Sequence, residues 1–480
     1  MARNLGIHIH ETATSANEPA TADVGIPFVV GTAPIHTANV PAKVNVPVLC
    51  RSWNDAVEHL GFSFDWKSYS LCEFMYSHFQ LYGCQPVVFC NVLDPEKDEM
   101  TDKNAGSGQE PIQIAEHQAI LPFSAVSCTI QVSVTTDFGE ALKRDVDYSI
   151  FYDENACVVE LLETSEHYNV QQLYIKYEAV KPDAVGKVDI IDALNSIDYS
   201  MSIVGVVPDL ICAPGWSHDR AVAAVMATKA ESINGLFRAK ALIDISTDSV
   251  RKYSDLVTAK NEGRIVDENQ IACWPMVTAD GYMFHMSTHL AGLMAQVDMS
   301  NGGVPYESPS NKNFKIDGCC LADGTEVNLS FDQVNLIVDW GIVTTMNFLS
   351  LGWIAKGNYT ACYPSNTDVK DQFIPVSRMF DYVSNTLIRT FWSKLDKPMN
   401  LRLLDNIQDT CNIWLNGLVS QEYLLGARVE LRTTENPVSN LLAGIISANI
   451  YLTPPIPAQE FNFSLEFNVD DLANALNWAG

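Results

Sequence analysis

An alternation of strand and helix patterns stops near residue 94 and resumes near residue 186, and this interruption constrains the fold more than any other feature. Before it, an apolar run at 24–31 predicts a buried strand, 69–82 predicts an amphipathic helix, and 86–91 predicts a second strand. Such alternation is typical of a parallel or mixed sheet with helices on its faces. We therefore expect an α/β core that is split by an insertion.

The inserted residues, 95–185, have the pattern of an all-β domain. After a charged loop at 94–110, short alternating runs at 128–135, 148–152, 157–162 and 173–177 predict strands in a small sandwich or barrel. Residues 94–183 contain 18 acidic and 6 basic side chains, which accounts for 12 of the chain's 28 excess negative charges. Because so many like charges are best placed in water, we expect the insertion on the outside of an assembly.

The α/β pattern returns after the insertion. Ser217 is the expected N-cap of a helix there, as Ser52 is of a helix that begins at Trp53. The expected elements are a strand at 203–207, a turn at Ala213-Pro214-Gly215-Trp216, a helix at 218–234, strands at 238–245 and 271–275, and a helix at 287–298.

The last 130 residues form another unit, for which the sequence predicts helices at 376–395 and 400–420 and strands at 427–432 and 445–452. Residues 378–432 contain 7 basic and 6 acidic side chains, so this unit is better suited than the acidic remainder to approach an inner partner. The candidate residues for that contact are Arg378, Arg389, Lys394, Lys397 and Arg402. A final strand is predicted by the alternation of Phe461, Phe463, Leu465 and Phe467 with polar residues.

The first 22 residues have the composition of an arm. Leu5, Ile7 and Ile9 alternate with glycine and histidines, which is a strand period, and a polar stretch follows at 11–23. A strand without a local partner is suited to pairing with the sheet edge of another chain. The alternative, a frayed terminus, fits the composition equally well.

Length and charge exclude several classes of protein. A chain of 480 residues predicts two to four domains. A net charge of −28, from 30 basic and 58 acidic residues, disfavours nucleic-acid binding and docking on anionic membranes. The sequence has no signal-peptide core and no run of 18 apolar residues, so we expect no membrane insertion and no secretory route. The 12 cysteines lack C-x-x-C spacing, which predicts buried free thiols.

No catalytic motif is present: the sequence has no G-x-S-x-G elbow, no P-loop and no G-x-G-x-x-G. His285 and His289 have the i, i+4 spacing of a helical metal pair, but the intervening glutamate and a third ligand are missing. Ser217 and His218 are neighbours in sequence, which does not make a hydrolase triad. Ala213-Pro214-Gly215-Trp216 is a tight turn or, alternatively, part of a ligand site at the end of a strand. We expect no catalytic residue, cofactor or metal.

Several separated motifs, in the right order, resemble the tail sheath family of contractile phages. These are Leu5-Gly6-Ile7-His8-Ile9-His10-Glu11, Ile26-Pro27-Phe28-Val29-Val30-Gly31-Thr32-Ala33, the segment 208–216 with its Ala-Pro-Gly-Trp turn, Ser308-Pro309-Ser310-Asn311-Lys312, Phe380-Asp381-Tyr382 with Phe391-Trp392, Asn436-Pro437, and Pro457-Ala458-Gln459-Glu460-Phe461. Many members carry a tryptophan near the Ser-Pro-Ser-Asn-Lys segment, which this chain lacks.

The resemblance implies an α/β plus β fold: a subtilisin-like α/β core without protease activity (23–94 and 186–350), a β-sandwich insertion (95–185), and an α+β C-terminal sheath domain facing the tail tube (351–460). It also implies arms, at 1–22 and 461–480, that add strands to neighbouring subunits through Leu5, Ile7, Ile9, Phe461, Phe463, Leu465 and Phe467.

The implied function is that of a sheath subunit that polymerises helically around a tail tube and contracts to drive the tube through a cell envelope. The implied partners are many copies of the chain, the tube protein, and baseplate and tail terminator proteins. The implied location is the tail of a virion or tail-like particle, assembled in the bacterial host cytoplasm. The alternatives are a tail tube or surface-lattice protein, and a subtilisin-like hydrolase.

Overall fold

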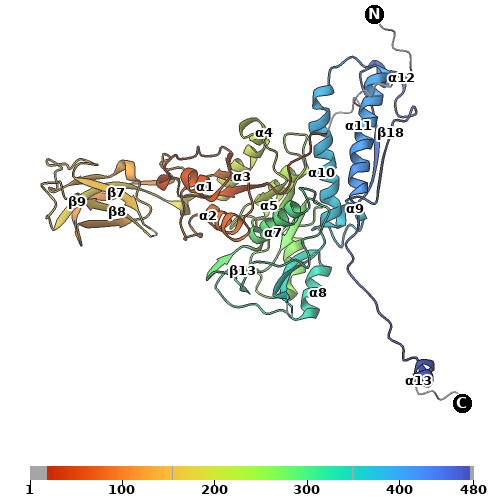
Figure 1. Cartoon of the computed structure of the whole chain (residues 1–480). Coiled ribbons are helices and arrows are strands. Elements are labelled where there is room, and N and C mark those ends of the chain that lie inside the picture. Colours follow the sequence, from red (N-terminus) through yellow and green to blue (C-terminus); the bar gives the residue numbers. More distant parts are fainter. Residues whose placement is uncertain (1–18, 154, 349–350, 476–480) are drawn as a thin grey trace, which may run out of the picture.

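The computed structural model describes residues 19–153, 155–348 and 351–475, so the arm residues Leu5, Ile7 and Ile9 lie outside the described part of the chain. The molecule is elongated (Figure 1). A β-rich unit stands at one end, an α/β body lies in the middle, and a pair of long helices stands at the other end. From that last end a C-terminal segment runs away from the rest of the chain.

The body is built on one central sheet, which within the described residues has eight strands in the order β17-β16-β12-β11-β10-β1-β3-β2. The six inner strands are parallel, and β17 and β2 pair antiparallel at the two edges. The strands are β1 Pro27–Gly31, β2 Val48–Cys50, β3 Val87–Asn91, β10 Leu210–Cys212, β11 Lys240–Asp244, β12 Gln270–Cys273, β16 Ile342–Asn347 and β17 Trp353–Lys356.

Strands from both sides of the insertion pair with each other in this sheet. β1 lies between β3 and β10, where Phe28 pairs with Val88 on one side and with Ile211 on the other. All residues of β1, β3, β10, β11 and β12 are buried, as expected for strands that are covered on both faces. The sheet therefore holds together segments that lie far apart in sequence, since Phe28 and Ile211 are 183 positions apart.

Helices surround the sheet, and the predicted helices at 69–82, 218–234 and 287–298 are confirmed within a few residues. The first is a helix whose second half is a π-helical turn at Tyr76–Leu81. The helices of the body are α1 Trp53–Leu60, α2 Ser70–Met75, α3 Lys187–Leu194, α4 Ser200–Ile203, α5 Arg220–Glu231, α6 Leu256–Glu262, α7 Met286–Ser300 and α8 Phe331–Asp339. A small sheet, β13 Met276–Ala279, β14 Tyr282–Phe284 and β15 Gly318–Cys320, lies beside them.

One of the two predicted helix caps is correct. The Ser52 hydroxyl accepts a hydrogen bond from the Asp55 N–H at 3.1 Å and caps α1. The cap of α5 is Asp219, whose carboxylate accepts from the Ala221 N–H at 2.8 Å, so the prediction of Ser217 was wrong. Ser217 instead donates to the Asp244 carboxylate at 3.0 Å, because it points back toward the end of β11.

The strand predicted at 203–207 is also wrong. Residues 200–203 form the short helix α4, and the strand that enters the sheet is β10, in a segment for which no strand was predicted. β10 has only three residues and is preceded by Pro208, so its apolar run was too short to separate from its surroundings.

The inserted unit consists of two three-stranded sheets, ordered β4-β9-β6 and β5-β8-β7, with a hydrophobic cluster of its own between them. The predicted strands at 148–152, 157–162 and 173–177 are confirmed. The loop predicted at 94–110 is wrong from residue 101 onward, because polar β4 pairs with β9 through two irregular shifts that hide its period. The strands are β4 Thr101–Gln113, β5 Gln118–Pro122, β6 Gln131–Ser133, β7 Tyr148–Tyr152, β8 Ala156–Leu161 and β9 Gln172–Val180.

The C-terminal unit contains the two long helices, α10 Ile374–Phe391 and α11 Leu401–Ser420, and both were predicted. The strands β18 Gly426–Glu430 and β19 Asn449–Thr453 pair antiparallel and pack on α11. The short helices α9 Val369–Gln372 and α12 Val438–Leu442 lie before and within this unit, and α13 Val469–Ala475 ends the C-terminal segment. Among the described residues, no helix combines the length and apolar character that a membrane crossing requires.

Alanine substitutions at two helical glycines are expected to change the stability of the protein in opposite directions. A Cβ at Gly292 of α7 would lie 2.5 Å from the Tyr82 ring, which is held by hydrogen bonds to His289 and Lys315. Gly292→Ala should therefore lower the stability by about 1–3 kcal/mol through overpacking. Gly417 of α11 has nothing within 4 Å of its Cβ position, so Gly417→Ala should raise the stability by about 0.5–1 kcal/mol. Thermal unfolding of the two variants checks both signs, and equal effects would contradict the packing described for α7.

Candidate assembly site

The C-terminal segment carries apolar side chains that the chain does not bury. Phe461, Phe463, Leu465 and Phe467 are 74%, 85%, 98% and 75% exposed. Residues 454–468 form no helix or strand, and the segment extends away from the body (Figure 1). The strand predicted at Phe461–Phe467 is therefore not formed with any described residue of the same chain. Monomeric soluble proteins rarely expose so many large apolar groups in a row, so the segment has the composition of an interaction surface.

The segment keeps the strand period even without a partner. The rings of Phe461 and Phe463 lie on one side with centroids 6.4 Å apart and an interplanar angle of 19°. The start of the segment is attached to the rest of the chain, because the Tyr359 hydroxyl donates a hydrogen bond to the Gln459 side-chain oxygen at 2.8 Å. The segment therefore has a fixed starting point and a free apolar face beyond it.

The small β18–β19 sheet has one covered and one open edge. The Val429 N–H donates to the Asn412 side chain at 3.2 Å, and the Val429 carbonyl accepts from Gln408 at 3.4 Å, so side chains of α11 cover the outer edge of β18. Val429 pairs with Ile450, and in an antiparallel pair two opposed residues point their main-chain groups in the same sense, inward or outward. The main chain of Ile450 therefore points outward, and no described residue pairs with that edge of β19.

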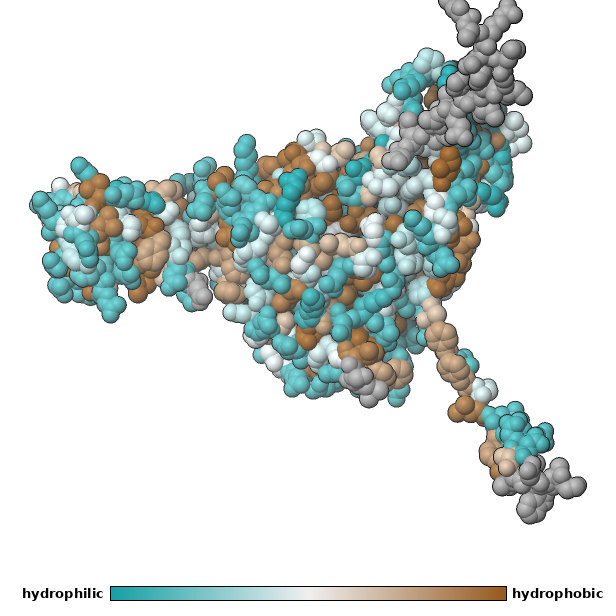
Figure 2. All heavy atoms as spheres, in the orientation of Figure 1, coloured by the Kyte–Doolittle hydropathy of each residue, from teal (hydrophilic) through white to brown (hydrophobic). Residues whose placement is uncertain are grey.

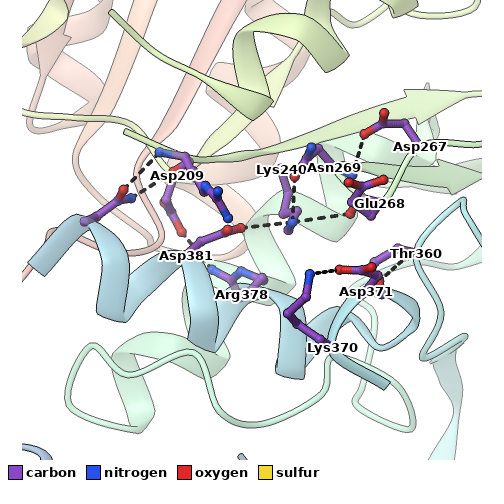
Figure 3. A network of polar contacts seen from close by, with 12 residues as sticks. Asp209, Lys240, Asp267, Glu268, Asn269, Thr360, Lys370, Asp371, Arg378 and Asp381 are labelled. Carbon is purple, nitrogen blue, oxygen red and sulfur yellow. Dashed lines mark hydrogen bonds and ion pairs between the residues drawn. The ribbon is translucent and has the colours of Figure 1, made fainter. Parts of the chain in front are cut away.

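A buried cluster of charges ties α10 to the body. The Arg378 guanidinium, with a side chain 4% exposed, contacts the Asp298 carboxylate of α7 at 2.6 Å and the Asp209 carboxylate before β10 at 2.8 Å. Asp381, one turn further along α10, forms an ion pair with Lys240 of β11 at 2.9 Å. Figure 3 shows Arg378 and Asp381 pointing from α10 toward the loops and strand ends that carry Asp209 and Lys240.

These contacts lie at the amino ends of the parallel strands. Asp209 precedes β10 and also accepts from the Ile26 N–H before β1 at 2.8 Å. The Lys240 ammonium at the start of β11 donates to Asn269 before β12 at 3.0 Å. The Asn385 amide of α10 accepts from the Arg238 N–H at 2.9 Å and donates to its carbonyl at 2.8 Å. One helix thus connects the starts of four neighbouring strands, and we call this set of contacts the α10 clamp.

Burial and neighbouring charges shift the pKa values of the clamp residues in opposite directions. Burial raises the pKa of Asp298 to about 6, although the charge of Arg378 and its hydrogen bond act to lower it. Burial also raises the pKa of Asp381 against the opposing charge of Lys240. For Arg378, burial alone would lower the pKa, but Asp298 and Asp209 outweigh it and hold the pKa above its ordinary value. The guanidinium is therefore charged, and its removal would leave carboxylates buried without a cation.

The five residues proposed to face an inner partner separate into two groups. The prediction for Arg378 is wrong, because the clamp buries it. Arg389 is partly buried and pairs with Asp23 at 2.7 Å. Lys397 and Arg402 are exposed and Lys394 is half-buried, so these three are accessible to another chain.

The other charged residues of the clamp, Asp209, Asp298, Lys240 and Asp381, were not predicted as site residues from the sequence. Two of them carry a signal, because each is a charged residue next to a buried apolar run: Lys240 begins β11, and Asp298 ends the buried face of α7. Such residues are almost never fully buried unless they are paired. Their partners lie in distant segments, so the pairing itself could not be read from one sequence.

A cleft of about 740 Å³ lies at the opposite, carboxyl ends of the strands and includes Trp216 of the Ala-Pro-Gly-Trp turn. The Asp244 carboxylate at its floor accepts from the Ser217 hydroxyl and from both the main chain and the hydroxyl of Ser287. These serines are therefore bound to a carboxylate and not to a histidine, which is not the arrangement of a nucleophile and its base. Gly215 has a φ of 77°, which is the conformation that the tight turn requires.

The two histidines with metal-pair spacing have separate partners. Burial alone would lower the pKa of His285, but the charge of buried Glu73, 2.8 Å from Nδ1, and its hydrogen bond raise it to about 9. Burial lowers the pKa of His289 to about 3, and its Nδ1 lies 3.2 Å from the Tyr82 hydroxyl. Within the described ranges, no group of His, Cys, Asp and Glu side chains is arranged to hold a metal ion.

The cysteines are free thiols, and all except exposed Cys128 are buried. Burial raises the pKa of these thiols, for example that of Cys90 to about 11 and that of Cys411 to about 11. The prediction of buried free thiols is confirmed for all but Cys128.

Known proteins that resemble the chain are tail sheath proteins. No model of a known protein family matches it. The chain is 21% identical over 482 residues to the tail sheath protein of Burkholderia phage BcepMu, and the match covers 97% of each chain. It is 28% identical over 283 residues to a prophage major tail sheath protein of Pseudomonas aeruginosa strain UCBPP-PA14, covering 57% of this chain and 68% of the other. The resemblance to tail sheath proteins is confirmed.

Solved structures share the fold over nearly the full length. The helical sheath of the anti-feeding prophage in its contracted state has a TM-score of 0.59 at 14% identity, with 98% of this chain and 100% of that one covered. The sheath complex of an extracellular contractile injection system, PVC, in its contracted state has a TM-score of 0.57 at 13% identity, with 98% and 99% covered. The expected mixed α/β fold is confirmed by this likeness.

The α10 clamp predicts a large effect for one substitution. Arg378→Met should lower the stability by about 3–5 kcal/mol near pH 8, because Asp298 and Asp209 then stay buried without their cation. Arg251→Met removes an ion pair with Asp323 in which both side chains are about half exposed, and it should change little. Urea unfolding of the two variants measures the difference, and a small loss for Arg378→Met would contradict the clamp.

The loss of stability caused by Arg378→Met should depend on pH. Because the folded pKa of Asp298 is raised, to about 6, its protonated form favours the folded state, and its contribution to stability falls as pH rises from about 4 to about 6. Removal of Arg378 removes a charge that lowers this pKa, so the variant's folded state takes up a proton at still higher pH. The stability difference between wild type and Arg378→Met should therefore shrink between pH 8 and pH 5. A difference that grows on acidification would contradict this assignment.

Proposed function

We propose that the chain is the structural subunit of a contractile tail sheath, which polymerises helically around a tail tube and contracts to drive the tube through a cell envelope. Similarity to a tail sheath protein over 97% of both chains supports this function, as does the shared fold of sheaths in the contracted state. The observation that carries the proposal is the exposed alternating segment Phe461–Phe467, which has a use only in contact with another chain.

Strand exchange between copies is the proposed mode of assembly. Phe461, Phe463, Leu465 and Phe467 of one copy would add as a strand to the open edge of β19 of another, whose outward main-chain groups are available. Burial of each such side chain stabilises the contact by roughly 1.5–3 kcal/mol, and the ordering of the segment offsets part of that gain. Leu5, Ile7 and Ile9 are proposed to act in the same way.

The geometry of the segment favours an open array. The apolar segment points away from the sheet that would receive it (Figure 1), so donor and acceptor lie on different surfaces of one subunit. A contact between different surfaces is heterologous, and it generates a helix when the rotation does not close into a ring. A helical array of many copies follows from this arrangement.

Contraction is proposed to be a movement of stiff bodies joined by flexible segments. The α10 clamp fixes the C-terminal unit to the α/β body, while residues 454–468 have no regular structure that would resist bending. The bodies can then rotate while the exchanged strands keep them connected. Energy stored during assembly would drive the change, which requires no nucleotide site.

We propose that the domains divide as 23–94 with 186–350, 95–185, and 351–460, with arms at 1–22 and 461–480. The acidic insertion would face outward, and the C-terminal domain would face the tube through Lys394, Lys397 and Arg402. The partners would be the tube protein and the baseplate and terminator proteins of a phage tail or tail-like particle, assembled in the host cytoplasm. The core would be subtilisin-like without enzymatic activity, consistent with the carboxylate-bound serines near Asp244.

Substitution within the C-terminal segment tests this assembly. Phe463→Asp should leave folding intact, because the side chain contacts no core, and should abolish long hollow tubules in negative-stain micrographs. Ser464→Asp places the same charge on the alternate side of the same segment and should retain tubules. Normal tubules from Phe463→Asp would contradict strand exchange, and loss of circular dichroism would place the segment in the folded core.

Deletion of the first 18 residues tests the other arm. The deletion should stop there, because Ala22 and Val24 pack on the cluster around α10 and Asp23 pairs with Arg389. Folded subunits that no longer polymerise are expected, since one of the two exchanged strands is missing. Tubules of normal length would show that this arm has no role in assembly.

A further inference from the structure

An apolar groove lies between α4 and the C-terminal end of α10, outside the surfaces used so far. It has a volume of about 410 Å³. Its floor contains the buried side chains of Ile197, Val207 and Phe237. Its rim carries Met201, Leu236 and Trp392, which are 45%, 38% and 58% exposed. Figure 2 shows hydrophobic surface over α4, where this groove opens. We call it the α4–α10 groove.

The first described residues of the chain lead directly to this groove. The Ala22 N–H donates to the Thr386 hydroxyl at 3.0 Å, and the Ala20 N–H donates to the Thr390 hydroxyl at 3.1 Å. Followed backward from Ala22 to Ala20, the chain therefore runs along α10 toward its C-terminal end, where Trp392 forms the rim. Ala20 itself lines the groove. The residues that precede it consequently begin at the mouth of an apolar depression.

In the sequence of residues 1–18, Leu5, Ile7 and Ile9 alternate with glycine and histidines, and a polar connection follows at 11–18. Ile9 and Ala20 are eleven positions apart, and at about 3.3 Å per position the connection extends roughly 36 Å, so it is long enough to fold back. The entropic penalty for closing such a short loop is small. Three aliphatic side chains on one side of a strand match a groove whose floor and rim are aliphatic and aromatic.

We propose that the α4–α10 groove holds the chain's own Leu5–Ile9 segment in the unassembled subunit, and that this contact competes with its donation to a neighbour. The regulatory part of this inference rests on the proposed function, whereas the contact itself does not. A tethered segment has a millimolar effective concentration at its own groove, which exceeds that of free subunits in solution. Polymerisation is then slow until a template raises the local concentration of acceptor edges.

Photo-cross-linking of the full chain tests the contact. Benzoylphenylalanine replaces Leu236 at the rim, or Val146, a 57% exposed position in the insertion, as the control. Equal amounts of ¹⁴N- and ¹⁵N-labelled subunits are mixed at a concentration where they stay monomeric, irradiated, and mapped by mass spectrometry. Cross-links from position 236 to residues 5–9 within one isotope are expected, and none from position 146. Cross-links only between isotopes, or none to residues 1–18, would overturn the proposal.

The kinetics of assembly test whether the contact delays polymerisation. If the groove holds the chain's own segment, a rim substitution shortens the lag. If the groove holds another copy, the same substitution lengthens the lag. Leu236→Asp should release the segment and shorten the lag of polymerisation several-fold in light scattering, whereas Val146→Asp should leave the lag unchanged. A longer lag for Leu236→Asp would make the groove a contact between copies and overturn the proposal. Polymerisation without residues 1–18 would instead contradict the proposed function of the arm. The cross-linking experiment is done on monomers, so its result does not depend on whether the arm acts in polymerisation.

Discussion

A buried ion cluster around Arg378 joins α10 to the central sheet and to α7. It brings three distant segments, those of Asp209, Asp298 and Arg378, into one buried site. Without it, α10 would cross the amino ends of the strands with unpaired carboxylates beneath it, and the penalty for burying such charges exceeds that of most single contacts. The cluster therefore fixes one orientation of α10 on the sheet. The position of the elements that pack on α10 is therefore fixed relative to the sheet.

Three elements that we propose to act in assembly are attached to α10 or to its unit. The first described residues run along α10 through Thr386 and Thr390, and α11 packs on the β18–β19 sheet with its open edge. The C-terminal segment starts from the same unit. In the proposed assembly, a pull on an exchanged strand would pass through α10 to the parallel sheet, whose strands β1, β10, β11 and β12 are fully buried. The acidic insertion lies at the opposite end of the molecule from α10, so it is not part of this path (Figure 1).

The sequence predicted those elements whose cause is local. Apolar runs located most of the buried strands, amphipathic patterns located α2 and α10, and Ser52 was recognised as a cap from its chemistry alone. Polar β4 was missed, because irregular pairing with β9 removes the alternation that marks a strand. β10 was missed because three residues are too few to show a period. The alternation of Phe461 to Phe467 identified the candidate site, since an unburied pattern of this kind has no explanation within one chain.

The role of Arg378 was predicted wrongly for a physical reason that is not local. Counting charges in a segment cannot distinguish an arginine in water from one paired with Asp298, 80 residues away in sequence. The covered edge of β18 and the open edge of β19 likewise depend on which side α11 packs, and one sequence does not contain that information.

A cryo-EM map of the assembled protein at side-chain resolution would show whether the C-terminal segment of one copy pairs with another copy. We expect residues 461–467 of each subunit to form a strand against the outer edge of β19 of another subunit, with the α10 clamp intact in both. A map in which this segment lies against its own chain, or in which the open edge of β19 stays unpaired in the assembly, would contradict this expectation.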